Sequence, residues 1–69
     1  MTTYSKAVGS VCIYIILDGD GPRNIGALQA LYDGQKWCSF ADALNWALEN
    51  GSITYDPATR LYSADPFFE

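Results

Sequence analysis

The chain contains no histidine and only two cysteines, which leaves little material for catalysis or covalent cross-linking. Histidine is the commonest general base and a common metal ligand. Cys12 and Cys38 are too few for the disulfide framework of small secreted domains, so we expect both to be free thiols. These absences predict a protein that is not an enzyme and that holds no metal and no cofactor.

Basic residues and long apolar runs are also scarce. Four Lys and Arg residues stand against eight Asp and Glu residues, for a net charge of −4. A nucleic-acid-binding protein usually presents a basic patch, which this composition disfavours. The longest apolar run, Val11 to Leu17, is too short to span a bilayer, and no signal-peptide pattern is present. We therefore expect a cytoplasmic protein with no membrane association.

What the chain does have is enough apolar material to fold. Of its 69 residues, 49% are hydrophobic and 17% are charged, unlike the composition of disordered chains. Ordering a chain of this length costs on the order of 100 kcal/mol, which a small core can only just offset. Most large apolar side chains are therefore expected to be structural, within a single domain covering residues 1–69.

The N-terminal third has the spacing of a helix over residues 4–17. Apolar residues recur three, four and one positions apart, which places them on one helical stripe: Tyr4, Val8, Val11, Cys12, Ile15 and Ile16. A strand is the alternative, because Val11–Ile16 is rich in β-branched and aromatic residues. The length of the stripe favours the helix. The turn-forming residues of Asp18–Pro22 should end it.

Two shorter helices are expected next. Asn24 is suited to cap a helix over 25–33 that Gly34 follows, with Ile25, Leu28, Leu31 and Tyr32 as its apolar stripe. Ser39 and Asp42 have capping-box spacing at the start of a helix over 40–50, which Gly51 should end. The expected buried stripe of this third helix is Phe40, Leu44, Ala47 and Leu48. Its expected outward residues are Asp42, Asn45, Trp46 and Glu49.

Residues 53–63 have the pattern of a β-hairpin. Two short β-prone runs flank Asp56–Arg60, in which Pro57 presets a turn and the Asp56 carboxylate can accept a backbone hydrogen bond. Beyond the hairpin, the Phe67–Phe68 tail either folds onto the core or forms a contact surface. The chain as a whole is expected to be a small α+β domain.

Three helices followed by a hairpin resemble the winged-helix variety of the helix-turn-helix family, over roughly residues 8–63. The lead-in Gly21–Ile25 with Leu28 and Leu31 looks like that family's second helix. Residues 40–48 and 51–62 look like its third helix and wing. The resemblance implies a winged helix-turn-helix domain. Its known members include DNA readers, protein-interaction modules and subunits of larger assemblies.

In the DNA-binding members the third helix enters the major groove and the wing holds the backbone. That resemblance would assign DNA contacts to Arg23, Lys36, Ser39, Asn45 and Arg60. The charge argues against it, because residues 38–69 contain five acids and a single base, Arg60. The surface that should approach the polyanion would repel it.

The leading hypothesis is therefore a non-catalytic module that binds a protein with a basic surface. The expected contact residues are Asp42, Asn45, Trp46, Glu49 and Asp56. In size and acidity the chain is also similar to small phage and mobile-element inhibitors, such as anti-CRISPR proteins and DNA mimics. The alternative is a DNA-binding transcriptional regulator acting as a dimer. Self-association through the 8–16 segment or the Phe67–Phe68 tail is considered for either role.

Overall fold

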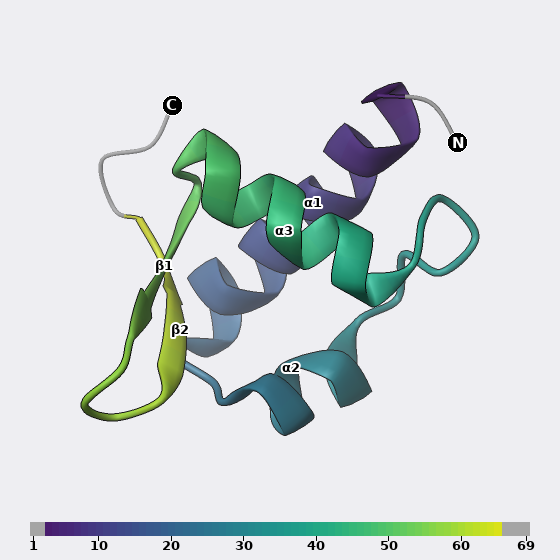
Figure 1. Ribbon diagram of the computed structural model, residues 1–69. Coiled ribbons are helices and arrows are strands. Elements are labelled where there is room, and N and C mark those ends of the chain that lie inside the picture. The colour runs from purple at the N-terminus through teal and green to yellow at the C-terminus, as the bar shows by residue number, and fades with distance from the viewer. Residues whose placement is uncertain (1–2, 66–69) are drawn as a thin grey trace.

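The computed structural model describes residues 3–65 and has the expected α+β layout of three helices followed by a two-stranded antiparallel hairpin (Figure 1). The elements are α1 (Thr3–Asp20), α2 (Ile25–Leu31), α3 (Phe40–Asn50), β1 (Ile53–Asp56) and β2 (Leu61–Ala64). The side chain of Tyr4 and the Phe67–Phe68 tail lie outside the described residues. Within residues 3–65, no helix is both long enough and apolar enough to cross a membrane.

The segment that could have been a strand is helix α1, and it is longer than expected. It continues to Asp20 rather than ending at residue 17. Gly21 then takes a left-handed conformation with φ of 84°, and its N–H donates to the Leu17 carbonyl at 3.0 Å. This closure caps the last turn, so Gly19 and Asp20 are accommodated inside the helix.

The buried side of α1 differs from the expected stripe. Ile13 and Leu17 are buried together with Gly9 and Ser10, whereas Val11 and Ile15 are 53% and 62% exposed. The expected stripe is therefore correct in part: Cys12 and Ile16 are partly buried and pack against the core, whereas Val11 and Ile15 do not. Residues 11–17 are all apolar, so their local pattern fits a core on more than one side of the helix. Packing against α3 selects the side that contains Gly9.

Helix α2 is shorter than expected, although its N-cap was correctly predicted. The Asn24 side chain accepts a hydrogen bond from the Ala27 N–H at 2.8 Å. The helix ends at Leu31, because Tyr32 adopts an extended conformation (φ −65°, ψ 125°). Gly34 is therefore not the helix stop. Leu28 and Tyr32 are buried, but Ile25 and Leu31 of the expected stripe are exposed.

Helix α3 has the predicted bounds and both predicted caps. The Asp42 N–H donates to Ser39 Oγ at 3.3 Å, and Gly51 caps the C-terminus in the left-handed region at φ 81°. The buried residues are Phe40, Ala43, Leu44 and Ala47. Leu48 was expected in this stripe but remains 36% exposed.

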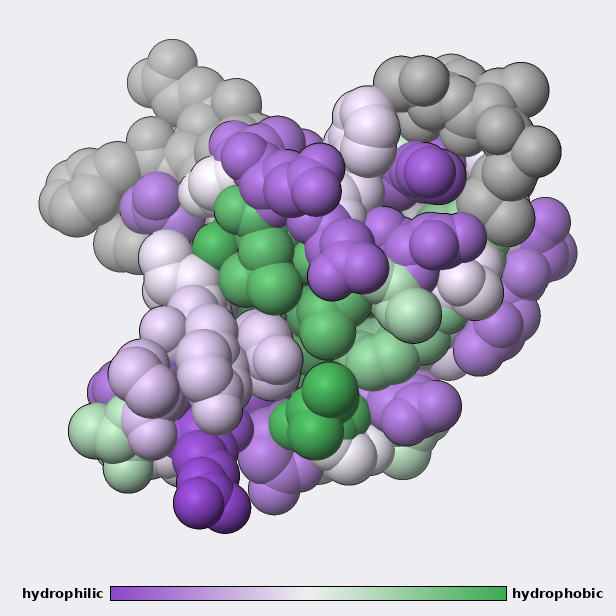
Figure 2. Space-filling view, viewed as in Figure 1, coloured by the Kyte–Doolittle hydropathy of each residue, from purple (hydrophilic) through white to green (hydrophobic). Residues whose placement is uncertain are grey.

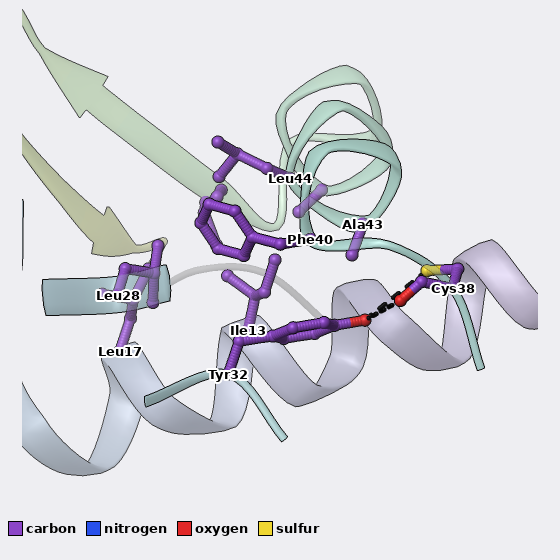
Figure 3. Close-up of a cluster of buried hydrophobic side chains, with 10 residues drawn as sticks. Ile13, Leu17, Leu28, Tyr32, Cys38, Phe40, Ala43 and Leu44 are labelled. Atoms are coloured by element: carbon purple, nitrogen blue, oxygen red, sulfur yellow. Dashed lines mark hydrogen bonds between the residues drawn. The ribbon is translucent and has the colours of Figure 1, made fainter. Parts of the chain in front are cut away.

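The core forms where α1 packs against α3, and α2 closes one side (Figures 1 and 3). Its members are Ile13, Leu17, Leu28, Tyr32, Cys38, Phe40, Ala43, Leu44, Ala47 and Ile53. Gly9 permits the close approach of α1. A Cβ at this position would collide with Cys38 Sγ and would lie 2.9 Å from the Tyr32 hydroxyl and 3.0 Å from Ala43 Cβ.

The hairpin has the predicted turn chemistry and is tied to the rest of the fold. Asp56 Oδ1 accepts from the Ala58 N–H at 2.9 Å, and Ile53 pairs with Ala64 at the open end. Arg23, in the α1–α2 connection, exchanges two backbone hydrogen bonds with Tyr62, of 3.0 and 2.7 Å. An isolated β-bridge thus ties the α1–α2 connection to strand β2 of the hairpin. This layout is compatible with a winged helix.

Candidate protein-binding surface

The outward side of α3 brings together four of the five residues predicted to contact a protein. Asp42, Asn45 and Glu49 lie three and four positions apart, which places them on one helical face. Asn45 and Glu49 are exposed and Asp42 is half-buried. Trp46 is half-buried at the edge of this face, where it lines a hollow of about 200 Å³ with Glu49 and Asn50. We call Asp42, Asn45, Trp46 and Glu49 the α3 face.

A larger hollow lies between α2 and α3 and was not foreseen from the sequence. It has a volume of about 470 Å³ and is open to solvent. Its apolar lining includes Ile25, Phe40 and Leu44, and its polar lining includes Gln29 and Asn45. Figure 2 shows hydrophobic side chains gathered over α3 and toward the start of α2. We call this hollow the α2–α3 groove.

The groove was missed because its apolar residues were all assigned to the core. Ile25 begins α2 and is 52% exposed, so one side of it contacts the groove while the other meets water. The sequence contains no clear signal for it, because Ile25, Leu28, Leu31 and Tyr32 have the spacing of a single buried helical stripe.

Asp56, the fifth predicted contact residue, belongs to the hairpin loop rather than to the α3 face. Its carboxylate accepts from the Ala58 N–H, and its carbonyl accepts from the Arg60 N–H at 2.7 Å. Arg60 has a positive φ of 59°, which is uncommon for a residue with a side chain. Asp56 thus has a structural role in closing a strained loop.

The residues predicted for DNA contact are spread over separate segments. Arg23 is half-buried before α2 and donates to the Pro22 carbonyl at 2.8 Å, and Arg60 lies in the hairpin loop. Lys36 lies in the turn before α3, with its Nζ 5.7 Å from the centre of the Trp37 ring. The Ser39 hydroxyl caps α3 by accepting a hydrogen bond from the Asp42 N–H. Of the five residues predicted to contact DNA, Asn45 is the one that lies within α3, where it is exposed.

The titratable groups in the interior serve packing. Burial, followed by the hydrogen bond with Cys38, raises the pKa of Tyr32 well above its ordinary value. The Tyr32 hydroxyl lies 2.9 Å from the Gly34 carbonyl and 2.7 Å from the Cys38 carbonyl, so the neutral phenol is the form that fits (Figure 3). Burial and then the nearby Asp33 raise the pKa of Cys12, which disfavours a reactive thiolate. Among residues 3–65, no His, Cys, Asp and Glu cluster could hold a metal ion.

Comparisons with known proteins add no further guide to function. No protein-family model, no curated protein and no solved structure matches the chain. The surface chemistry of α2 and α3 is therefore the basis for a functional proposal.

Proposed function

We propose that this chain is a non-catalytic interaction module that binds a basic protein surface through the α3 face and the α2–α3 groove. The observation that carries the proposal is the juxtaposition of an open apolar groove and an acidic helix face. Interfaces combine an apolar centre with a polar rim, and the groove and the α3 face supply these two parts side by side.

The negative charge of α3 favours a partner with a basic surface. The helix contains Asp42 and Glu49 and no Lys or Arg, so its field attracts cations and repels phosphate. An apolar or aromatic side chain flanked by Lys or Arg would insert into the groove while its basic neighbours face the carboxylates. Proteins that handle nucleic acid present such surfaces. An inhibitor or regulator of nucleic-acid machinery is therefore the role we propose.

The second candidate is DNA binding by a dimeric winged helix. It is favoured by the exposed outward side of α3 and by the hairpin next to it in the chain. Phosphate contacts supply most of the affinity for DNA. The chain has four basic residues for such contacts: Lys6, Arg23, Lys36 and Arg60. The charge makes this the weaker proposal.

The first experiment captures the partner from native cells and then measures binding of the purified pair at several salt concentrations. Glu49→Lys should slow association by about 3- to 10-fold at low salt, because it reverses a charge on the proposed surface. Asp18→Lys is the matched control, since it makes the same charge change at the exposed end of α1. Equal effects of the two variants would attribute binding to net charge alone and refute the α3 face.

The groove is tested separately by removing an apolar wall. Ile25→Ser should speed dissociation, whereas Leu31→Ser, on the same helix but outside the groove, should leave it unchanged. Salt-sensitive, sequence-selective DNA binding in gel-shift assays, weakened by Arg23→Ala and Arg60→Ala, would favour the second candidate instead.

A further inference from the structure

Two rows of side chains run next to each other along α3, and each row spans two turns of the helix. Successive members of a row are three and four positions apart, which places each row on one side of the helix. Each polar member directly follows an apolar member in the sequence, so the two rows are neighbours. The apolar row is Ala41, Leu44 and Leu48, and the polar row is Asp42, Asn45 and Glu49.

The apolar row borders the α2–α3 groove and continues beyond it. Ala41 and Leu44 line the groove, and Leu48 lies one turn after Leu44 with 36% of its surface exposed. Asn45, in the middle of the polar row, also lines the groove. A molecule that fills the groove therefore lies beside the polar row.

Of the two helices that form the groove, α3 alone contains charged residues. Helix α2 has no Asp, Glu, Lys or Arg, whereas the polar row of α3 begins with Asp42 and ends with Glu49. Asp33 and Lys36, in the segment that joins the two helices, have opposite charges. The field across the groove is therefore one-sided, and it favours cationic groups on the α3 side.

The separation of the two carboxylates favours a helical partner. Asp42 and Glu49 are seven residues apart, which is about 10.5 Å along the helix axis at a rise of about 1.5 Å per residue. Two residues seven positions apart on a partner helix have the same separation and lie on the same side of it. Residues on one face of a strand are about 6.6 Å or about 13 Å apart, so a strand matches the two carboxylates less well.

From these features we propose that the occupant of the groove is an amphipathic helix of the partner protein, lying along α3. Its apolar stripe packs on the groove and the apolar row, and two Lys or Arg residues seven positions apart on one flank of that stripe pair with Asp42 and Glu49. This inference rests on the proposed function and names the structural element that the partner supplies.

The helices of the described chain do not include such an element. Helix α1 contains Lys6 as its single basic residue, and α2 and α3 contain none. A second copy therefore has no helix with the required pair of cations. The charge pattern assigns the groove to a helix of a different protein.

Two synthetic helical peptides of equal composition test the spacing. Both have the same leucine stripe, and the matched probe has two lysines seven positions apart on one flank, whereas the mismatched probe has them four positions apart. Fluorescence anisotropy at low salt should show that the matched probe binds about 2- to 5-fold more tightly, because it forms two ion pairs instead of one. Circular dichroism verifies that the two probes are equally helical. Equal affinities, or tighter binding of the mismatched probe, would overturn the proposal.

Double-mutant cycles then assign each lysine of the matched probe to a carboxylate. Asp42→Asn and Glu49→Gln are each combined with replacement of either lysine by glutamine, and each carboxylate should be coupled to a different lysine by about twofold or more. Asp18→Asn removes a charge at the exposed end of α1 and should be coupled to neither lysine. Coupling of both carboxylates to the same lysine, or to neither, would contradict the seven-residue match.

The same variants separate this inference from the proposed function. If the matched probe does not bind, while the captured partner still responds to Glu49→Lys and Ile25→Ser, the helical occupant is wrong and the protein-binding surface stands. If neither the probe nor the captured partner responds to those substitutions, both the occupant and the surface are wrong.

Discussion

The two sides of α1 differ sharply in environment although they are built from the same residue types. Ile13 is fully buried and Ile15 is 62% exposed, two positions apart in one helix. On the inner side, Gly9 and Ile13 meet α3 and the Cys38–Tyr32 pair, with no room for an added methyl group at Gly9. On the outer side, Val11 and Ile15 are both more than half exposed.

The difference shows that side-chain type alone does not locate the core of this protein. The inner side is defined by its smallest residue, because Gly9 lets the helices approach closely enough to surround Ile13. The outer side has larger apolar side chains and less burial. The stability of the monomer therefore depends more on the inner side than on the outer side.

The largest expected contrast is between alanine substitutions at the two isoleucines. Ile13→Ala should lower the free energy of unfolding by about 2–5 kcal/mol, because it opens a cavity in the core. Ile15→Ala should change it by about 0.5 kcal/mol or less in the monomer. Urea unfolding of dilute protein, followed by tryptophan fluorescence, measures both. Similar losses at the two positions would show that the Ile15 side of α1 is also covered within the monomer.

A second contrast uses the two glycines of α1. Gly9→Ala should lower the free energy of unfolding by about 1–3 kcal/mol, because the added Cβ collides with Cys38 and crowds Tyr32 and Ala43. Gly19→Ala has nothing within 4 Å of the added Cβ and should stabilise the helix by up to about 1 kcal/mol. Thermal unfolding of both variants provides the measurement. Stabilisation by Gly9→Ala would mean that α1 and α3 pack less closely than described.

A smaller effect is expected where Tyr32 closes the inner side. Tyr32→Phe should cost about 1–2 kcal/mol, because it removes a hydroxyl that bonds buried carbonyls.

The pH dependence of this effect has a defined sign. The pKa of Tyr32 is raised in the folded state, mainly by burial, so its contribution is complete below the unfolded value of about 10 and is lost as pH rises above it. Cys12, whose pKa is also raised, adds to the alkaline loss in both proteins. Urea unfolding between about pH 8 and pH 11 should therefore show a smaller decline in the variant. Parallel declines would contradict this assignment.

The elements with clear local signals were predicted most accurately. Ser39 and Gly51 mark the ends of α3, and Asn24 caps α2, because capping chemistry depends on residues only a few positions away. Asp56 likewise closes its own turn. The α3 face was predicted for the same reason, since helical spacing alone places Asp42, Asn45 and Glu49 together.

The remaining features depend on tertiary contacts that the local pattern does not contain. Which side of α1 is buried depends on the close approach of Cys38 and Ala43 to Gly9. Both residues are far from Gly9 in sequence. The α2–α3 groove depends on how far Ile25 stands from α3. The early end of α2 follows from Tyr32 turning into the core to bond carbonyls beyond it.

The two backbone hydrogen bonds between Arg23 and Tyr62 also bear on how the chain folds. Helices α2 and α3 lie entirely inside the loop that this pairing closes, and closing a long loop costs entropy before any contact is gained. The hydrogen bonds within the helices and the hairpin turn join residues that are close in sequence. The step that joins residue 23 to residue 62 is the one of long sequence separation, so we expect the docking of the hairpin to limit the folding rate.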